Sequence, residues 1–587
     1  YKFGAISSTY TITFKTQLTD PTSWAGNSNT TFVNDAWLYP TGSGDSSHAQ
    51  GQQPVNPNVV AKSGSYDYTT HELTWAISAN TTKVPLTNVV LADSLTGNGL
   101  DDFDLETGTI QVDGTTIAAS SSSSPDVGTY YYDTSMKLLT INLGDLNGSD
   151  TSSRTKTITF KMKLNKTGSD YDSYFSKNGV KNITNVANLT STESPTPATS
   201  SATVGINNTV VGKTGSYTGG KAYIDWSVEV NQNGISLQDV TLTDTLAEGL
   251  ELDTSSIAVY PQTIASDGSL SPTLMHDSDG NISVAGTPVT LAKDNVSYDA
   301  ETRKFVLTLP EGVGDGAPCL IVFRTTIDLA YAGQKSFSNQ IDLNGSTTSE
   351  TSSSGGVSTV FSSSDGTAYG TTANVTVTKV TSTGTPLAGA IFGLYDQYGN
   401  LVRISSATDA SGNATFGHIN YATKYSIAEL SAPADYIKSN TVDYFMISKA
   451  TKQIQLYTVD SQGNWTASGD PIATLPAFAN TLKAGTITFT KLGDGGAPLS
   501  GAEFTLCDAS GNPISGFAAQ TSDADGKVTF TGVLYGDYLI KETGAPVGYV
   551  PLTISVSLHD SNTMITTDGT TNTLDLGNQQ DTAQGSL

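Results

Sequence analysis

The chain of 587 residues carries 29 Lys and Arg against 55 Asp and Glu, which gives a formal net charge of −26 at neutral pH. This charge argues against nucleic acid and anionic membrane surfaces as partners, and the length predicts about three to five domains. Short alternating segments such as residues 156–164 (KTITFKMKL) and 483–492 (KAGTITFTKL) recur between turn residues. This pattern is typical of antiparallel sandwiches, so the predicted fold class is all-β, as a linear array of β-sandwiches.

The first segment, residues 1–41, is predicted to be the C-terminal part of an incomplete sandwich. Residues 9–24 (TYTITFKTQLTDPTSW) and 32–38 (FVNDAWL) resemble closing strands, with Asn34 as a terminal Asn. The strands that should precede them are missing, and a half-sandwich exposes open sheet edges. We therefore expect strands from the same precursor or from a neighbouring subunit to complete it. The polar residues 41–58 are predicted to be a linker.

Two larger units follow, at residues 59–192 and 209–348, and they align closely with each other. The equivalent positions are Lys62 and Lys213, Trp75 and Trp226, Asp93 and Asp244, and Asn185 and Asn339. Internal repetition of this kind indicates a linear array. The Pro, Thr and Ser-rich residues 191–203 and the Ser, Gly and Thr-rich residues 346–370 are predicted to be linkers.

Two smaller units, at residues 372–482 and 483–580, complete the chain. Each places a Lys on an early strand, a Glu on a middle strand and an Asn on the last strand. The two triplets are Lys379, Glu429 and Asn480, and Lys491, Glu542 and Asn578. Lys483 joins the two units with almost no spacer, so we expect a stiff junction.

These residue types predict a self-formed Lys–Asn isopeptide bond in each complete unit. Burial disfavours the ammonium, and the neutral amine is a nucleophile. A buried acid stays protonated and can shuttle protons as ammonia leaves, and positioning is worth roughly 7–11 kcal/mol. The promoting acids would be Glu429 and Glu542 in the smaller units and Asp93 and Asp244 in the larger ones. Because the reaction runs once per unit, the chain is not expected to be an enzyme. The alternative is that each Lys and acid is an exposed surface charge.

The sequence resembles Gram-positive adhesins and pilins that sortases assemble on the cell surface. The smaller units are similar to collagen-adhesin B-type domains in their T-K, G-x-x-L-x-G-A-x-F and E-x-x-A-P motifs and their terminal Asn. The larger units resemble the A-type domains of the same proteins, and together the likeness covers nearly the whole chain. It implies immunoglobulin-like sandwiches, intramolecular isopeptide bonds and an extracellular, wall-anchored location. From the incomplete first segment we also expect that Asn34 can be bonded to a Lys outside this chain.

Two functions are expected from these features. The first is a pilin or stalk that projects from the wall and bears mechanical load, with other pilin subunits or the cell wall as partners. The alternative is an adhesin that binds a host matrix protein such as collagen, or a mucin, through its paired A-type units. A carbohydrate-active enzyme is weaker, because no paired-carboxylate cleft is identifiable.

The remaining motifs predict no cofactor and no metal. Cys319 and Cys507 lie in different units and lack metal-type partners. The Asp-rich residues 276–281 and 522–527 lack a distal Glu ligand and are predicted to be turns. No signal peptide, membrane span or sorting tail is read from the sequence.

Overall fold

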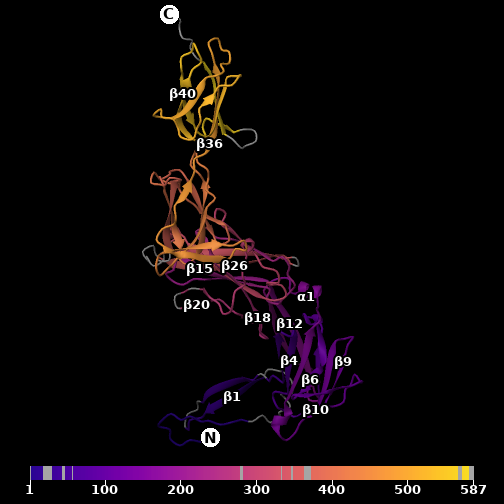
Figure 1. Ribbon diagram of the computed structural model, residues 1–587. Helices are drawn as coiled ribbons and strands as arrows, with labels where there is room; N and C mark the ends of the chain where they lie inside the picture. The colour runs from indigo at the N-terminus through magenta and orange to yellow at the C-terminus, as the bar shows by residue number, and fades with distance from the viewer. Residues whose placement is uncertain are drawn as a thin grey trace.

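The computed structural model describes residues 2–16, 30–41, 46–55, 57–277, 280, 282–331, 333–345, 348–361, 372–565 and 572–580. It is an elongated array of β-sandwiches that runs from the N-terminal hairpin to the last small unit (Figure 1). The described part of the chain includes one short α-helix, α1 (Ser169–Tyr174), and four 3-10 turns, at Leu100–Asp102, Thr151–Arg154, Lys293–Asn295 and Leu329–Tyr331. The predicted all-β class and the linear array are confirmed.

The first large unit, residues 59–208, packs two antiparallel sheets face to face. One sheet has the order β3-β4-β11-β6-β7 and the other has the order β13-β12-β5-β10-β9-β8. Alternate residues of each strand enter the core, as in β4, where every second residue is buried. The strands are β3 (Val60–Asp67), β4 (Glu72–Ala79), β5 (Leu86–Ser94), β6 (Phe103–Val112), β7 (Thr115–Thr116), β8 (Ala118–Ala119), β9 (Thr129–Asp133), β10 (Leu138–Leu146), β11 (Lys156–Leu164), β12 (Gly179–Thr190) and β13 (Ala198–Asn208).

The second large unit, residues 209–361, repeats this plan with sheets β14-β15-β24-β17 and β22-β23-β16-β25-β26. Two small hairpins, β18–β19 and β20–β21, are inserted after β17. The strands are β14 (Val211–Ser216), β15 (Tyr223–Val230), β16 (Thr241–Thr245), β17 (Leu250–Pro261), β18 (Thr263–Ile264), β19 (Leu270–Ser271), β20 (Met275–His276), β21 (Ile282–Ser283), β22 (Val296–Asp299), β23 (Lys304–Thr308), β24 (Cys319–Ile327), β25 (Gly333–Gly345) and β26 (Thr348–Phe361).

The first small unit, residues 372–482, has a three-stranded sheet β30-β27-β35 and a six-stranded sheet β29-β28-β31-β32-β33-β34. Its first and last strands, β27 and β35, pair in parallel. The strands are β27 (Thr372–Thr381), β28 (Ile391–Asp396), β29 (Leu401–Ile404), β30 (Asn413–Asn420), β31 (Lys424–Ser431), β32 (Val442–Ile447), β33 (Ile454–Val459), β34 (Trp465–Ile472) and β35 (Phe478–Asn480).

The second small unit, residues 483–580, has sheets β39-β36-β43-β42 and β38-β37-β40-β41. Here too the first and last strands, β36 and β43, run parallel. The strands are β36 (Ala484–Leu492), β37 (Glu503–Asp508), β38 (Gln520–Thr521), β39 (Lys527–Leu534), β40 (Gly536–Gly544), β41 (Thr553–Leu558), β42 (Met564–Ile565) and β43 (Asn572–Gln580).

The N-terminal segment forms a separate hairpin of β1 (Thr30–Leu38) and β2 (Ser47–Val55) that projects from the first large unit (Figure 1). The expected strand at residues 9–24 is wrong for its described part, because residues 9–16 belong to no strand. The apolar side chains of Tyr10, Ile12 and Phe14 alternate along this segment and are exposed. The backbone of residues 9–16 pairs with no strand in the described part of the chain. Residues 17–24 lie outside the described residues.

Each segment that was predicted to be a linker contains the last strand of a unit. Strands β2 and β26 fall within these predicted linkers, and β13 begins within one and continues past residue 203 to Asn208. Each of the three pairs along its length with the strand before it. The Ser and Thr-rich composition conceals the pattern, because hydroxyl side chains face solvent while Val204 and Ile206 are buried. The large units therefore extend to residues 208 and 361, beyond the predicted ends at 192 and 348.

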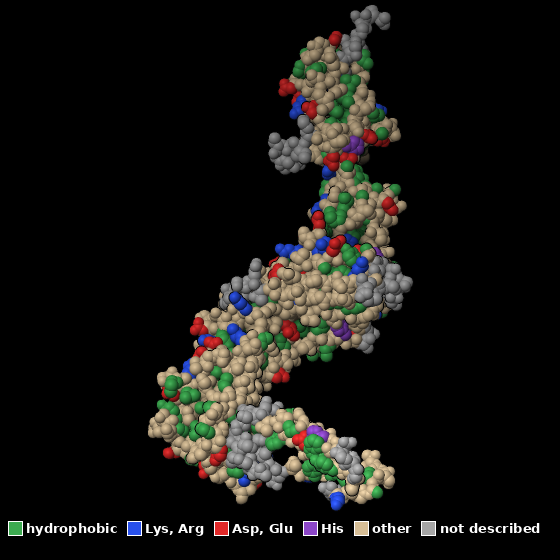
Figure 2. Space-filling view, turned by 180° about the vertical axis from the view of Figure 1, so that it is seen from behind, with side chains coloured by type: hydrophobic (Ala, Val, Ile, Leu, Met, Phe, Trp, Pro, Cys, Tyr) green, Lys and Arg blue, Asp and Glu red, His purple; other side chains and the backbone are tan. Residues whose placement is uncertain are grey.

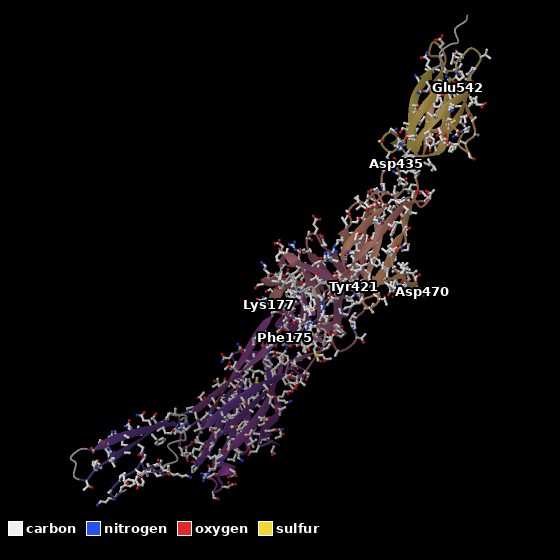
Figure 3. All side chains as sticks on the ribbon, turned by 90° about the vertical axis from the view of Figure 1, so that its left-hand side faces the viewer. Phe175, Lys177, Tyr421, Asp435, Asp470 and Glu542 are labelled. Atoms are coloured by element: carbon white, nitrogen blue, oxygen red, sulfur yellow. The ribbon has the colours of Figure 1, made fainter. Side chains whose placement is uncertain are left out.

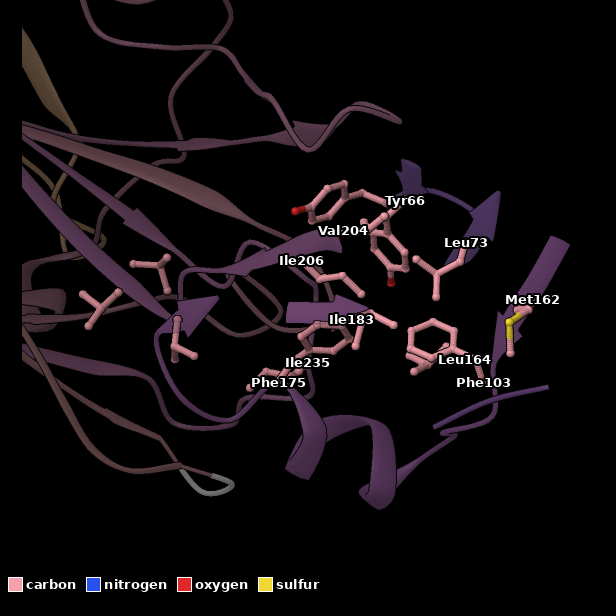
Figure 4. Packing of buried hydrophobic residues seen from close by; sticks show 14 of the residues in the cluster. Tyr66, Leu73, Phe103, Met162, Leu164, Phe175, Ile183, Val204, Ile206 and Ile235 are labelled. Carbon is pink, nitrogen blue, oxygen red and sulfur yellow. The ribbon is translucent and has the colours of Figure 1, made fainter. Parts of the chain in front are cut away.

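The two large units share one continuous hydrophobic core. Phe175 at the end of α1 packs close to Ile235 of the second large unit and to Ile206 of β13 (Figure 4). The backbone N–H of Ser236 donates to Asp172 Oδ1 at 2.9 Å across the same junction. This packing holds the two units against each other.

The second large unit also packs directly on the first small unit. Tyr398 is buried in the core of the large unit, and Arg403 Nη2 lies 3.2 Å from Glu251 Oε1. The hydroxyls of Ser255 and Thr423 lie 3.1 Å apart at this contact. The array is therefore tied together at its middle joint by apolar and polar contacts.

Charged residues hold the two small units together at the narrow joint seen in Figures 2 and 3. The backbone N–H of Asp435 donates to Asp560 Oδ2 at 2.9 Å, and the backbone N–H of Asp560 donates to Asp435 Oδ1 at 2.8 Å. Lys483 Nζ donates to both carboxylate oxygens of Asp560, at 2.8 and 2.6 Å. The Asp435–Asp560 contacts cross the joint, and the stiffness expected at Lys483 stays a prediction.

We expect this joint to loosen as the pH rises. His559 Nδ1 lies 2.7 Å from Asp435 Oδ2 and its Nε2 lies 3.5 Å from Asp537 Oδ1, and the hydrogen bond to Asp435 raises the pKa of His559. The stabilising contact is present at low pH and is lost as the pH rises through this raised pKa. Distances between spin labels on the two small units should broaden from about pH 5 to about pH 8. His559→Gln should remove the change, and an equal pH response in that variant would contradict the prediction.

A second prediction concerns β13. If residues 198–208 form a strand, their amides should exchange as slowly as those of their partner β12. Hydrogen exchange of the whole chain measures this directly, with the exposed hairpin strand β1 as a fast-exchanging comparison. Rapid exchange throughout residues 198–208 would restore the linker interpretation.

Candidate functional site

Each large unit buries a Lys–Asp pair between its two sheets. Lys62 on β3 is hydrogen-bonded through Nζ to Asp93 Oδ2 on β5, and Lys213 on β14 makes the same bond to Asp244 Oδ2 on β16. All four side chains are fully buried. Because the Lys strand and the Asp strand belong to different sheets, each pair bridges the sandwich.

Burial sets the protonation of these pairs. Desolvation lowers the pKa of Lys62 and lowers that of Lys213 to about 8. The same effect raises the pKa of Asp93 and Asp244, against the opposing attraction of each Lys. Both shifts favour a neutral amine beside a protonated carboxyl.

Aromatic rings form the walls around each amine. Lys62 Nζ lies 5.3 Å from the centre of the Trp75 ring, and Lys213 Nζ lies 4.9 Å from that of Trp226. The Trp side chains lie against Gly64 and Gly215, where a Cβ would overlap the ring. The two Trp residues are thus core residues.

The two Asn residues occupy equivalent buried positions next to the Asp residues. Asp93 lies opposite Ala187 in the β5–β12 pairing, and Asp244 lies opposite Ile341 in the β16–β25 pairing. The Asn is two residues before each of these positions and so faces the same side of the sheet. Both Asn185 and Asn339 are fully buried, and Asn339 Nδ2 lies 3.4 Å from Asp244 Oδ2.

A serine on the last strand of each large unit fixes the backbone of the Lys. The backbone N–H of Lys62 donates to Ser200 Oγ at 3.1 Å, and that of Lys213 donates to Ser353 Oγ at 3.0 Å. Sequence reasoning missed these residues because it assigned their strands to linkers. Their matching places in the two units are the signal that could have found them.

The first small unit brings its three predicted residues into mutual contact. Lys379 Nζ is hydrogen-bonded to Asn480 Oδ1 and lies 3.3 Å from Glu429 Oε1. Asn480 Nδ2 donates to the same Glu429 oxygen at 2.9 Å, while the other carboxyl oxygen accepts from the backbone N–H of Ser439 at 2.6 Å. Burial lowers the pKa of Lys379. The amine, the carboxyl and the carboxamide thus share one dry site.

A left-handed glycine holds the backbone of this Lys. The N–H of Lys379 donates to Gly412 O at 2.7 Å, and the φ of Gly412 is +77°. A Cβ at Gly412 would overlap the Lys379 carbonyl oxygen. The same contact recurs between Lys491 and Gly526, with the same distance and φ. The sequence marked only the second position, as the Asp-Gly turn at residues 522–527.

The second small unit does not bring its predicted Asn to its Lys. Lys491 Nζ lies 3.4 Å from Glu542 Oε2 in the buried site, but Asn578 is exposed and lies opposite Thr490. The strand pairing slips by one residue at Gly577, which has φ +68°. A slip of one residue turns a side chain to the opposite face. The predicted contact of Asn578 with Lys491 is therefore wrong for this register.

Asn34 lies on the exposed strand β1. The Lys and Asp strands that cover Asn185 and Asn339 have no counterpart beside it among the described residues. Its predicted Lys partner outside the chain stays a prediction.

The other predicted features carry little chemistry. Cys319 and Cys507 are free and buried, and burial raises the pKa of Cys319 to about 12. The described residues hold no cluster of three potential metal ligands. No helix in the described part of the chain is long and apolar enough to cross a membrane.

Two family models together match most of the C-terminal two-thirds of the chain. Residues 373–462 and 485–573 match the SpaA prealbumin-like fold domain, and residues 208–354 match the collagen binding domain. The resemblance to pilins and adhesins of Gram-positive bacteria is thereby confirmed at the level of these domain families. No curated protein matches the chain.

Three bacterial proteins are among the solved structures that match this chain. The Bacillus anthracis TIE protein is 16% identical over 64% of this chain and 57% of its own, with a TM-score of 0.25. The pilus adhesin SpaC of Lactobacillus rhamnosus GG is 16% identical over 85% of this chain and 57% of its own, with a TM-score of 0.22. The collagen-binding subdomain of Enterococcus faecalis ACE is 16% identical over 26% of this chain and 99% of its own, with a TM-score of 0.20. This chain thus spans 57% of the length of TIE and of SpaC.

The glycine contact generates a prediction about the first small unit. Gly412→Ala should destabilise it by about 3 kcal/mol, because the new Cβ overlaps Lys379 and the φ is unfavourable for Ala. Gly384→Ala is the matched control, with φ +88° and open space around its Cβ position, and should cost only about 1 kcal/mol. Hydrogen exchange of β27 measures both, and equal losses would show that the contact with Lys379 has no special role.

Proposed function

We propose that this chain is a surface stalk or pilin subunit of a Gram-positive bacterium that bears mechanical load. In this proposal Lys–Asn isopeptide bonds close its sandwiches. The observation that carries the proposal is the joint contact of Lys379, Glu429 and Asn480 in a site without solvent exposure. The match to pilin-type and adhesin-type domain families supports the surface location.

The contacts support a direct condensation in the first small unit. The neutral amine of Lys379 attacks the carboxamide carbon of Asn480, whose oxygen already accepts a hydrogen bond from that amine. Glu429 takes a proton from the attacking nitrogen and delivers one to the departing NH₂ group. One N–C bond forms, one N–C bond breaks, and ammonia leaves.

The large units offer the same chemistry with an Asp in place of the Glu. Asp93 and Asp244 are held beside their Lys residues, and burial favours the protonated carboxyl that this role requires. Asn185 and Asn339 supply the carboxamides on neighbouring strands. The reaction would occur once in each unit, so we propose maturation and no enzymatic turnover.

A covalent bond suits a protein that is pulled from its ends. It joins the first strand of a small unit to the last, whereas each backbone hydrogen bond between them contributes only about 1 kcal/mol net. The packed or charge-paired joints between successive units keep the array extended. Other pilin subunits or the cell wall would then be the partners that transmit the force.

An adhesin is the second candidate, because residues 208–354 match a collagen binding domain. In that function a host matrix protein such as collagen, or a mucin, would bind to the paired large units. The shared core at Phe175 and Ile235 disfavours a ligand threaded between them, since it fills their junction. Solid-phase binding of the whole chain to collagen, fibrinogen and mucin tests this role, and saturable binding to one of them would favour the adhesin.

The intact mass tests the bonds directly. We expect the protein to be lighter than its sequence by three ammonia molecules, about 17 Da each, one for each complete site. The three sites are Lys62 with Asn185, Lys213 with Asn339, and Lys379 with Asn480. A mass equal to that of the sequence would contradict the proposal, and a fourth loss would require another partner for Lys491 or another register of β43.

Substitution of the acid gives a sharper test. Glu429→Ala should raise the mass by one ammonia, relative to that expected for the substitution, because the proton shuttle is lost. The first small unit should lose about 4–5 kcal/mol, since the bond closes a loop of 101 residues. Glu542→Ala is the control and should leave the three ammonia losses unchanged, because Asn578 faces away from Lys491. An unchanged ammonia loss in Glu429→Ala would show that this acid is not required.

A further inference from the structure

We propose that the hairpin β1–β2 is a docking surface for the opening strands of another large-unit sandwich, strands that carry a buried Lys and Asp. Asn34 would then be the cross-linking partner of that Lys, and this second part rests on the proposed function. The occupant is identified by the two complete large units, which show what covers the same hairpin.

The register of the hairpin is the first observation. Asn34 lies opposite Gly51, just as Asn339 lies opposite Gly355 in the hairpin that closes the second large unit. A Cβ at Gly355 would approach the Lys213 carbonyl oxygen to 3.2 Å, so the small residue there leaves room for the Lys strand. At Gly51 the corresponding space is open.

The apolar face of β1 is the second observation. In β25, Phe337, Asn339, Ile341 and Leu343 face the core at every second position. β1 places Phe32, Asn34, Ala36 and Leu38 at the same spacing. Phe32 and Leu38 are 40% and 52% exposed, against 4% and 0% for Phe337 and Leu343. The face thus carries the alternating pattern of a core-facing strand, with its apolar side chains partly exposed.

The opposite face of the hairpin is that of an outer surface. Asp35 Oδ1 lies 2.7 Å from His48 Nε2 and accepts a hydrogen bond from Gln50 at 3.0 Å. Trp37 stacks on His48 with ring centres 4.1 Å apart. Val33 and Trp37 are also exposed on this side, so what distinguishes it is its polar contacts, whereas the side of Asn34 repeats the core-facing pattern of β25.

A segment with the sequence of an opposite-sheet strand is the third observation. Residues 11–15 read TITFK, as do residues 157–161 of β11, the central strand of its sheet. Ile12 and Phe14 are 54% and 65% exposed, whereas both equivalents in β11 are fully buried. A two-stranded hairpin is marginally stable alone in water. The segment therefore carries the sequences of closing strands from both sheets of a sandwich, although residues 11–15 form no strand in this chain.

The complete large units show which two strands pack against an Asn-bearing hairpin. In the second large unit, β16 pairs with the Asn strand and places Asp244 opposite Ile341. β14, the strand that carries Lys213, lies beside the last strand, β26, where Ser353 Oγ accepts the backbone N–H of Lys213. The Lys and the Asp are 31 residues apart in both large units. A partner for β1 needs these same two strands, with a Lys and an Asp at this spacing.

The first experiment is a tryptic map of the protein isolated from its own cells. We expect a branched peptide that joins the Asn34 segment to a Lys peptide from outside residues 1–587. The Asn185 and Asn339 peptides are the internal standard, because their absence as branched peptides would defeat the proposed function itself. If Asn34 is unmodified but the hairpin resists protease, the docking part of the proposal stands and the cross-link is rejected. Unmodified Asn34 in a protease-labile hairpin would overturn the proposal.

The second experiment supplies the missing strands. Residues 59–146, which hold β3 to β10 with Lys62 and Asp93, are fused through a Gly and Ser linker before residue 1 of the full chain. We expect the amides of β1 to exchange at least about tenfold more slowly than in the unfused chain. An Asn34→Ala fusion should keep this protection and lack one ammonia loss, whereas a Phe32→Asp fusion should lose the protection. If the amides of β1 exchange equally fast in the fused and the unfused chain, the docking proposal is overturned.

Discussion

The removal of a Lys and an acid from water is the constraint on which the rest of this chain depends. A buried charge pair gains little against the cost of its desolvation, and the raised pKa of Asp244 together with the lowered pKa of Lys213 expresses that cost. The pair is tolerated because aromatic rings, an Asn and a fixed backbone surround it. Each sandwich supplies these surroundings from several strands, so folding of the whole unit is needed to assemble the site.

The two kinds of unit meet this constraint by different means. In the large units the last strand reaches over the Lys strand and a Ser hydroxyl accepts its N–H, as Ser353 does for Lys213. In the small units a turn glycine does so through its carbonyl oxygen, as Gly412 does for Lys379. The position of the amine is thus set by the backbone in both cases, and the side-chain chemistry follows from it.

Sequence reasoning located the strands and most of the site, because alternation of apolar residues and repetition of the Lys, acid and Asn positions are local or periodic signals. It missed β13 and β26, since exposed Ser and Thr in a paired strand have the composition of a linker. It placed Asn578 on the wrong face, because a bulge at Gly577 changes the register without changing the motif. Close backbone contacts such as that of Gly412 depend on the folded geometry and leave only a turn signal in the sequence.

The parallel pairing of first and last strands in the small units determines which parts of them are free to change. A pull on the chain enters through β27 and leaves through β35, and these strands are direct neighbours. The strands between them lie outside this path, so insertions there leave the connection between the ends intact. The first small unit has such an addition, because its outer sheet continues into β33 and β34, while the equivalent sheet of the second small unit stops at β41. Sequence diversity in the middle strands is therefore compatible with constant strength along the array.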